Sequence, residues 1–318
     1  YFCEEIMRVI FNYDKNNRIS QPCTIALGTF DGIHQGHRQL IAELKKQKQR
    51  YGHQTIVYTF LTHPLQVLEP EKAPSRIMLL SEKIKEFSRL GIDILVLNSF
   101  DHAFLHQTPR IFMDQLYERY HIKAIVVGFN FHFGYQGTGD KAFLEKESKE
   151  KGWDLICVPP VRFEDKVVSS TLIRSFLSEG KVEEAAKMMT RPYCIRGKVI
   201  HGYGRGREMG FPTANLQFSN RKVLPKSGVY LAKCRLNGKM FWGMTNVGRN
   251  PTFSAKGLSI ETYLPNFDGD LYGQTMSIFF LTRLREEMKF ERVSDLTKQM
   301  KQDVKNVKKL IYISNWLC

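Results

Sequence analysis

The pattern of apolar runs changes near residue 190, and this change constrains the fold more than any other feature of the chain. Before it, five short runs rich in Ile, Val and Leu alternate with stretches of helical periodicity. The runs are residues 24–27, 55–60, 92–97, 124–127 and 155–158. Continuous apolar runs of this length are typical of parallel strands buried on both faces. They predict a doubly wound α/β domain that binds ligands at the carboxyl ends of its strands.

After residue 193 the pattern predicts antiparallel strands. The strand-like segments are 194–200, 229–236, 239–247, 258–264 and 276–281, and Asn237-Gly238 is typical of a two-residue hairpin turn. An amphipathic segment, 294–310, follows them. We therefore expect an antiparallel β-barrel closed by a C-terminal helix.

Residues 188–193 separate the two patterns, because Pro192 interrupts a helical stretch there. We expect two domains, 1–190 and 191–318. The length of 318 residues favours two cores over one. Within the first domain, one helix start is clear from the sequence, with Thr108 as N-cap and Pro109 at the first helical position.

Positive charge is concentrated in the second part of the chain. The whole chain has a formal net charge of +15, and residues 191–318, with 22 Lys and Arg against 9 Asp and Glu, account for +13 of it. Such a balance indicates anionic partners, among them nucleotide phosphates, nucleic acid and acidic membrane surfaces. Four lysines, at 298, 301, 305 and 308, recur on one helical face and carry no interleaved aromatic residues, which disfavours nucleic-acid binding.

Composition excludes several other classes of protein. We find no apolar stretch long enough to span a bilayer, and Glu4, Glu5 and Arg8 make the start unlike a secretory leader. The six cysteines are scattered, which fits neither a disulfide framework nor a zinc site. These features predict a cytoplasmic protein with no membrane partner.

Residues 28–37, Gly-Thr-Phe-Asp-Gly-Ile-His-Gln-Gly-His, stand where the first apolar run passes into the helical stretch 38–48. The first turn of a helix presents unpaired N–H groups and the positive end of its dipole, and glycines let backbone approach an anion closely. Spacing of three residues places His34 and His37 side by side, so both can donate to one phosphate chain. The segment therefore predicts nucleotidyl transfer.

This segment resembles the Gly-x-Phe-Asp-x-x-His-x-Gly-His signature of the nucleotidyltransferase superfamily. Members of that superfamily also carry Ile-Ser-Ser-Thr-x-Ile-Arg, and residues 168–174 read Val-Ser-Ser-Thr-Leu-Ile-Arg. Ser170 or Thr171 is suited to cap a helix and to supply further N–H groups for phosphate. Arg174 can place a fork of donors on the leaving pyrophosphate.

A glycine- and arginine-rich stretch, residues 197–215, ends in Pro-Thr-Ala-Asn and resembles the flavokinase motif of bacterial bifunctional riboflavin kinase/FMN adenylyltransferases, also called FAD synthetases. Further matches follow in 224–230, 243–253, 260–262, 270–273 and 284–290. The resemblance implies a nucleotidyltransferase domain followed by a flavokinase-like barrel. It also implies two activities: phosphorylation of riboflavin to FMN by ATP, and adenylylation of FMN to FAD with release of pyrophosphate.

For the kinase half, the resemblance implies that Glu261 is the base that accepts the proton of the ribityl hydroxyl. Thr213 and Asn215 are oxygen donors suited to Mg²⁺, and Thr213 also to ATP phosphates. Residues 202–207 would fold over the nucleotide, with Gly202 and Arg207 as ATP contacts. Asn246 and Arg285 are candidates for flavin contacts.

For the adenylyltransferase half, His34, His37 and Arg174 would act with Mg²⁺ by positioning and charge neutralisation, because the FMN phosphate is already anionic. The expected ATP contacts are Gly28, Phe30, Asp31, Gly36, Asn130, Ser170 and Thr171. One departure stands out: Leu61-Thr62 precedes His63-Pro64 where the family commonly has an acidic residue and proline. It leaves the flavin contacts there open.

Three alternatives remain at this point. The chain could adenylylate or cytidylylate another phosphorylated substrate, but this leaves the Pro-Thr-Ala-Asn half unexplained. It could retain only one of the two activities. It could instead be a basic regulator that binds nucleic acid, which salt-dependent binding to a random oligonucleotide would reveal.

Overall fold

The computed structural model describes residues 6–11, 17–62, 64–201, 210–249, 258–265, 267–288 and 290–315. Its contacts divide the chain into two compact units, residues 1–170 and 171–318. Among the described residues, no helix is both long and apolar enough to cross a membrane.

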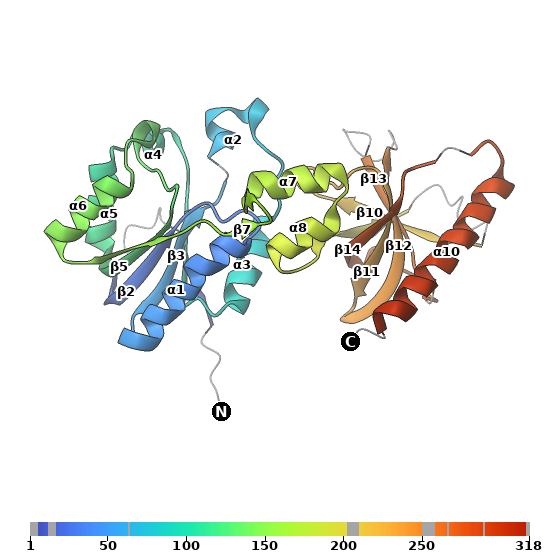
Figure 1. Cartoon of the computed structure of the whole chain (residues 1–318), viewed down its shortest axis with the longest axis horizontal. Coiled ribbons are helices and arrows are strands. Elements are labelled where there is room, and N and C mark those ends of the chain that lie inside the picture. Colours follow the sequence, from blue (N-terminus) through green and yellow to red (C-terminus); the bar gives the residue numbers. More distant parts are fainter. Residues whose placement is uncertain are drawn as a thin grey trace. The chain divides into compact units, whose positions relative to one another are not determined.

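The first unit is built on a six-stranded parallel sheet in the order β1-β4-β3-β2-β5-β6; Figure 1 labels β2, β3 and β5 of this sheet. Its strands are β1 (Arg8–Phe11), β2 (Ile19–Leu27), β3 (Gln54–Phe60), β4 (Ile94–Asn98), β5 (Tyr120–Gly128) and β6 (Asp154–Val158). The five strands expected from the apolar runs are confirmed. The sequence pattern missed β1, which has only four residues and lies at the edge of the sheet beside β4.

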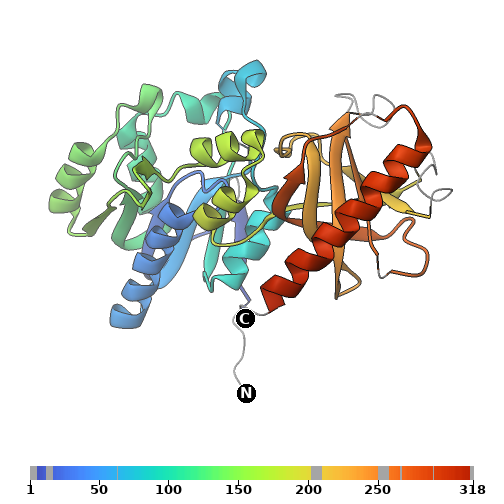
Figure 2. The same ribbon diagram turned by 45° about the vertical axis from the view of Figure 1, so that its right-hand side comes forward.

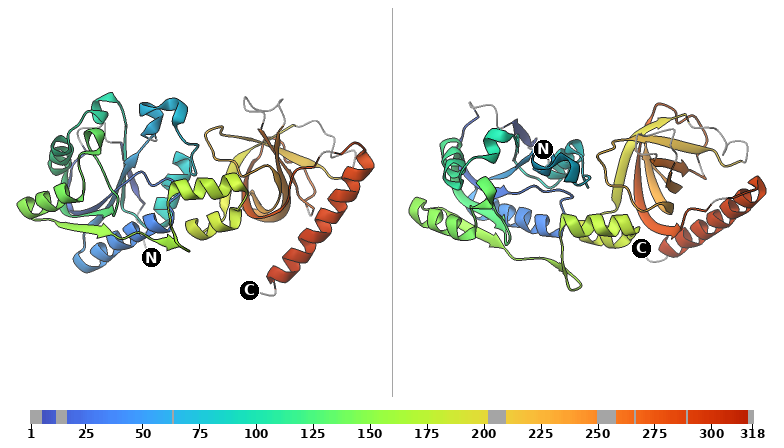
Figure 3. Two further views of the ribbon diagram at one scale, coloured as in Figure 1. Left: turned by 45° about the horizontal axis from the view of Figure 1, so that its top comes forward. Right: turned by 90° about the horizontal axis from the view of Figure 1, so that it is seen from above.

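Helices connect the strands and cover both faces of the sheet (Figure 3). They are α1 (Gln35–Tyr51), α2 (Leu65–Leu68), α3 (Leu80–Arg89), α4 (His102–Leu105), α5 (Pro109–Arg119) and α6 (Lys141–Lys151), with short 3₁₀ turns at Pro70–Lys72 and Tyr135–Gly137 and a small hairpin of β7 (Arg162–Phe163) and β8 (Lys166–Val167). The predicted start of α5 is confirmed, since the Thr108 side chain accepts a hydrogen bond from the Ile111 N–H at 3.3 Å.

The strand order reverses between β2 and β5, because the chain adds β3 and β4 on one side of β2 and then β5 and β6 on the other. Open α/β sheets bind ligands in the crevice at such a switch point, beyond the carboxyl ends of the strands. The residues that follow β2 and β5 are therefore the place to look for a site.

The second unit is a closed antiparallel barrel in the order β10-β13-β12-β11-β14-β9, confirming the predicted architecture. Its strands are β9 (Tyr193–Ile200), β10 (Thr213–Phe218), β11 (Gly228–Leu236), β12 (Lys239–Arg249), β13 (Leu258–Tyr263) and β14 (Thr275–Arg285). Asn237 and Gly238, with φ of 47° and 79°, make the predicted hairpin between β11 and β12.

Two elements cover the barrel. Helix α10 (Val293–Asn315) lies across its outside, where Val304 and Val307 pack against Leu231 and Met244 (Figure 2). Helix α8 (Val182–Met189), which follows α7 (Ser170–Glu179), contacts β9 and β14. The contacts thus group α8 with the barrel, upstream of the expected boundary at 190/191. That boundary, as the limit of two separable activities, remains a prediction.

Candidate active sites

The loop after β2 has an unusual backbone. Phe30, Gly32 and Ile33 have φ of 51°, 86° and 42°, in the left-handed region that residues with a side chain seldom adopt. Phe30 is fully buried, and its ring packs edge-on against Phe87 with 5.5 Å between centroids. Strained backbone of this kind persists only where the surroundings hold it in place, and it is concentrated at ligand sites.

The two histidines lie together at the start of α1. His34 is the N-cap, and its Nδ1 accepts a hydrogen bond from the His37 N–H at 3.4 Å. The rings stack with centroids 3.6 Å apart and planes at 19°. Gly36 permits this packing, because a Cβ there would lie 3.2 Å from the His34 ring. The predicted juxtaposition is confirmed, with the difference that His34 caps the helix rather than lying within it.

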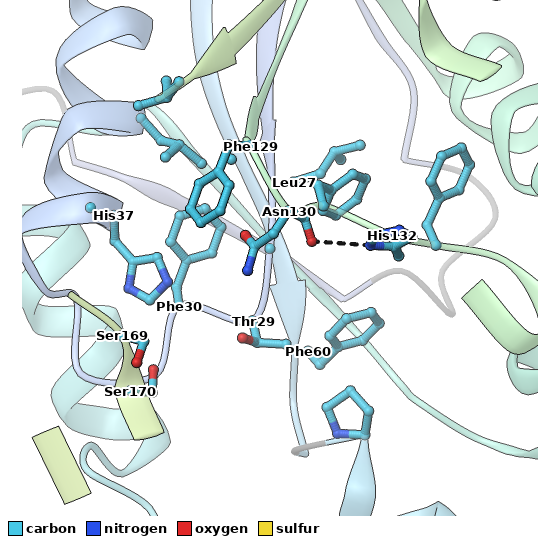
Figure 4. A pocket seen from close by; sticks show the side chains of 18 of the residues that line it. Leu27, Thr29, Phe30, His37, Phe60, Phe129, Asn130, His132, Ser169 and Ser170 are labelled. Carbon is cyan, nitrogen blue, oxygen red and sulfur yellow. Dashed lines mark hydrogen bonds between the residues drawn. The ribbon is translucent and has the colours of Figure 1, made fainter. Parts of the chain in front are cut away.

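A cavity of about 510 Å³ opens at the switch point, and both histidines line it. Figure 4 shows His37 among the side chains of its lining. Polar groups in its lining, here called the polar end, follow β2 and β5 or are serines: Gly28, Thr29, His34, His37, Asn130, Ser169 and Ser170. A connected cluster of aromatic rings, here called the aromatic end, also lines the cavity: Tyr58, Phe60, Phe100, Phe104, Phe112, Phe131 and Phe133. The cavity can therefore accept a ligand with an anionic part and a flat apolar part.

Of the ATP contacts expected in this unit, Gly28, Phe30, Gly36, Asn130 and Ser170 line the cavity. Asp31 is not among the residues that line it. Its buried carboxylate accepts hydrogen bonds from the Ile77 and Met78 N–H groups at 3.2 and 3.0 Å, which gives it a role in holding the loop.

The hydroxyl of Ser170 connects the two sequence motifs of this unit. It donates to the carbonyl oxygen of Asp31 at 2.8 Å, across 139 positions of sequence. Thr171 and Arg174 belong to the second compact unit, and their roles at the cavity remain predictions. His63 lies outside the described residues.

Sequence reasoning missed the aromatic end of the cavity. Its members come from β3, the segment between β4 and α4, α4, α5 and the segment after β5, and no single motif joins them in sequence. Phe60, Phe100 and Phe104 pack mutually with centroids 5.4 Å apart. A signal was present in the aromatic content of 12%, but only the fold assigns these rings to one wall.

In the barrel, strand register brings the predicted kinase residues together. Asn215 of β10 and Asn246 of β12 each lie directly opposite Glu261 of β13. Directly opposed residues on neighbouring strands project to the same face, so the three side chains form one row. Thr213, two residues before Asn215, shares its face. Gly202 and Arg207 lie outside the described residues.

Arg285 is placed differently from expectation. Its guanidinium donates to both carboxylate oxygens of Asp303 on α10, at 2.8 to 3.2 Å, and to the carbonyl oxygen of Glu286 at 2.9 Å. Asp303 is 3% exposed. In this structure Arg285 therefore fastens α10 to the barrel, and a flavin contact would have to compete with that pair.

Glu287 lies in the matched segment 284–290, and the motif analysis assigned it no role. A Cβ on Gly248 would collide with Glu287 Oε1 and would lie 3.0 Å from Asn246 Nδ2. Gly248 thus makes room for a carboxylate beside the amide that faces Glu261. Among the described residues, no group of three or more His, Cys, Asp or Glu side chains is arranged to hold a metal ion.

Comparison with known proteins assigns each half of the chain to a family. Residues 16–172 match the FAD synthetase family model, and residues 189–311 match the riboflavin kinase family model. The chain is 36% identical to the bifunctional riboflavin kinase/FMN adenylyltransferase of Bacillus subtilis, over 92% of each chain. It is 37% identical to the protein of the same name from Listeria monocytogenes, over 88% of this chain and 89% of the relative.

A solved structure from Streptococcus pneumoniae, described as a macrolide-efflux protein, superposes with a TM-score of 0.87 at 31% identity. The match covers 95% of this chain and 99% of that one. It therefore extends over both units of the fold.

Proposed function

Because the chain belongs to the family of bifunctional riboflavin kinase/FMN adenylyltransferases, we propose that its barrel phosphorylates riboflavin and its α/β unit adenylylates the resulting FMN. This assignment is supported by the presence of a different candidate site in each unit. The α/β unit contains the cavity with polar and aromatic lining, and the barrel contains the row of Asn215, Glu261 and Asn246. The proposed catalytic domains are 1–190 and 191–318.

In the barrel, the ribityl 5′-hydroxyl of riboflavin attacks the γ-phosphorus of ATP. A new oxygen–phosphorus bond forms, the bond to the β-phosphate oxygen breaks, and ADP leaves with the electron pair. The hydroxyl must lose its proton, and Glu261 is the proposed acceptor. Asn246 lies directly opposite Glu261, and we propose that it orients the flavin side of the reaction.

The barrel also offers oxygen donors for a metal ion. Thr213 and Asn215 lie on one face of β10, beside Glu261. Hydroxyl, amide and carboxylate oxygens are the donors that Mg²⁺ prefers. When bound, Mg²⁺ would neutralise phosphate charge, and Thr213 and Asn215 are the residues proposed to hold it.

In the α/β unit, an oxygen of the FMN phosphate attacks the α-phosphorus of ATP, and pyrophosphate leaves with the electrons of the broken bond. The nucleophile is already anionic, so this half needs donors rather than a base. His34, His37 and the N-terminal N–H groups of α1 are the proposed donors at the polar end. The aromatic end is proposed to take the isoalloxazine ring, which is flat and apolar.

We place both reactions in the cytoplasm, where ATP is available and where the four cysteines found free in the described residues would remain thiols. The small-molecule partners are ATP and flavins, and we propose neither nucleic acid nor a membrane as a partner.

The test is incubation of the purified chain with riboflavin, ATP and Mg²⁺, followed by chromatography of the flavins. FMN should appear first and FAD second, and FMN supplied directly should give FAD. Accumulation of FMN without FAD would contradict the assignment of the α/β unit. Conversion of FMN but not riboflavin would contradict the assignment of the barrel.

A further inference from the structure

The strained loop after β2 is fastened to α3 from both sides. The buried carboxylate of Asp31, in the loop, accepts the N–H groups of Ile77 and Met78 just before α3. In the opposite direction, Lys83 of α3 reaches back to the loop, and its Nζ donates to the carbonyl oxygen of Thr29 at 2.8 Å. Each element thus holds the other through one charged side chain.

Burial of the charged Lys83 side chain at this position costs desolvation free energy. Lys83 is 8% exposed, and burial lowers its pKa from the usual 10.5 to about 8, opposed by the attraction of Asp31 and reinforced by the repulsion of Arg76. An apolar side chain of the same length would avoid the desolvation. Since Thr59 Oγ1 already donates to the Thr29 carbonyl at 3.0 Å, hydrogen-bond satisfaction of that oxygen does not require a lysine.

The Lys83 ammonium contacts the peptide group that joins Thr29 to Phe30, and the geometry of that peptide indicates what the charge does. The described chain contains no cis peptide bond, and in a trans peptide the C=O and N–H point in opposite directions. With the Thr29 carbonyl held at Lys83, the N–H of Phe30 points away from Lys83. Thr29 and Phe30 both line the cavity that His34 and His37 also line, and the ring centroids of Phe30 and His37 are 5.0 Å apart. A cation on the carbonyl oxygen also polarises the peptide and strengthens its N–H as a donor.

We propose that Lys83 is a positioning residue for nucleotidyl transfer, which holds the Thr29 carbonyl so that the Phe30 N–H is presented to a phosphate oxygen of the bound nucleotide. This inference rests on the proposed adenylylation function of the α/β unit. Lys83 does not touch the nucleotide; it acts through one peptide group.

The test is Lys83→Met in the full chain, with Lys85→Met as its matched control. Lys85 is an exposed residue of the same helix, so the control repeats the substitution without touching the loop. Removal of one aimed donor costs about 10²–10³-fold in rate, and Lys83 acts on such a donor indirectly. We therefore expect Lys83→Met to lower kcat for FAD formation from FMN by about tenfold or more, with KM for FMN and the rate of riboflavin phosphorylation unchanged.

The pH profile separates positioning from packing. The rate of FAD formation by the wild-type chain should fall as Lys83 loses its proton near pH 8, and Lys83→Met should lack this limb. Asp31 and Arg76 are the charged groups that set the titration. Lys83→Arg, which keeps the charge, should recover part of the rate.

Several results would overturn the proposal. One is an unchanged kcat in Lys83→Met, and another is an equal loss in Lys85→Met. If Lys83→Met does not fold, the pH profile of the wild-type chain decides, and a rate of FAD formation that does not fall as the pH rises past about 8 would also overturn the proposal. His37→Ala in the same assay tests the cavity independently: FAD synthesis at the wild-type rate there would contradict the proposed function itself.

Discussion

The cavity of the α/β unit and the row of polar residues in the barrel are built in opposite ways. In the α/β unit, ten consecutive residues, 28–37, supply the loop, the helix N-terminus and both histidines. In the barrel, Asn215, Asn246 and Glu261 come from three strands and meet only through register. A site of the first kind is visible as a motif, whereas a site of the second kind depends on the whole barrel closing correctly.

This comparison predicts that the two activities can be separated by dividing the chain, and the complete loss of FAD formation from the C-terminal part is the largest expected effect. A fragment beginning at Thr171, and one beginning at Arg191, should each make FMN from riboflavin, ATP and Mg²⁺, and neither should make FAD at all. Chromatography of the flavins measures both reactions. A folded Thr171 fragment without kinase activity would show that the kinase site needs the α/β unit.

The same fragments test the role of α8. Val182, Ala185, Met188 and Met189 are buried, and burial of a large apolar side chain contributes about 1.5–3 kcal/mol. The Arg191 fragment should therefore be less stable than the Thr171 fragment by several kcal/mol. Thermal melts followed by circular dichroism compare them, and equal melting temperatures would contradict a structural role for α8.

Glu261→Gln should affect only the barrel. It preserves the size of the side chain but removes the proposed proton acceptor, so riboflavin phosphorylation should fall by roughly 10²–10⁴-fold. Adenylylation of supplied FMN should continue at the wild-type rate. Glu286→Gln, at an exposed carboxylate of the same unit, is the control. A normal kinase rate in Glu261→Gln would mean that another group takes the proton.

His37→Ala should affect only the α/β unit. If His37 is the donor to phosphate proposed above, its loss should slow FAD formation by about 10²–10³-fold, while FMN still accumulates from riboflavin. His121→Ala removes an exposed histidine of the same unit and should leave both rates intact. Equal effects of the two substitutions would sink the assignment of the 28–37 motif.

The substitution Lys83→Met should have a smaller effect than these, on how the free energy of unfolding depends on pH. Because the pKa of Lys83 is about 8 in the folded chain and near 10.5 when unfolded, the unfolded chain binds more protons between these values. The free energy of unfolding contributed by this group therefore rises with pH, by on the order of 3 kcal/mol across the window. Urea unfolding of wild type and Lys83→Met from pH 7 to 10.5 measures it. A constant difference between the two proteins would contradict the burial of the charge.

The pair of Arg285 and Asp303 gives the smallest expected effect. Since the Arg285 side chain is 19% exposed, solvent weakens the pair, and Asp303→Ala should destabilise the barrel by about 2 kcal/mol. Arg285→Ala should cost a similar amount if its role is to hold α10. If Arg285→Ala instead raises KM for riboflavin without changing the melt, the residue contacts flavin as the family resemblance implies.

The sequence alone predicted those elements that depend only on residues close together in the chain. The apolar runs predicted five of the six parallel strands, Asn237-Gly238 predicted its turn, and Thr108-Pro109 predicted the start of α5. The strand β10 escaped, because Ala214 and Asn215 have low β-propensity. This strand is stabilised by pairing with β9 on one side and β13 on the other. The sequence of residues 213–218 alone does not predict these pairings.

The sequence by itself also predicted the helix N-terminus at residues 28–37 with its glycines and two adjacent histidines, since all of these groups lie close together along the chain. Only the tertiary structure decided which distant groups surround them. It brought Phe60, Phe100 and Phe104 to one wall, placed Lys83 beneath the Thr29 carbonyl, and paired Arg285 with Asp303. The physical reason is that periodicity encodes which face of an element is buried, whereas contacts between elements depend on register and on the crossovers that order the sheet.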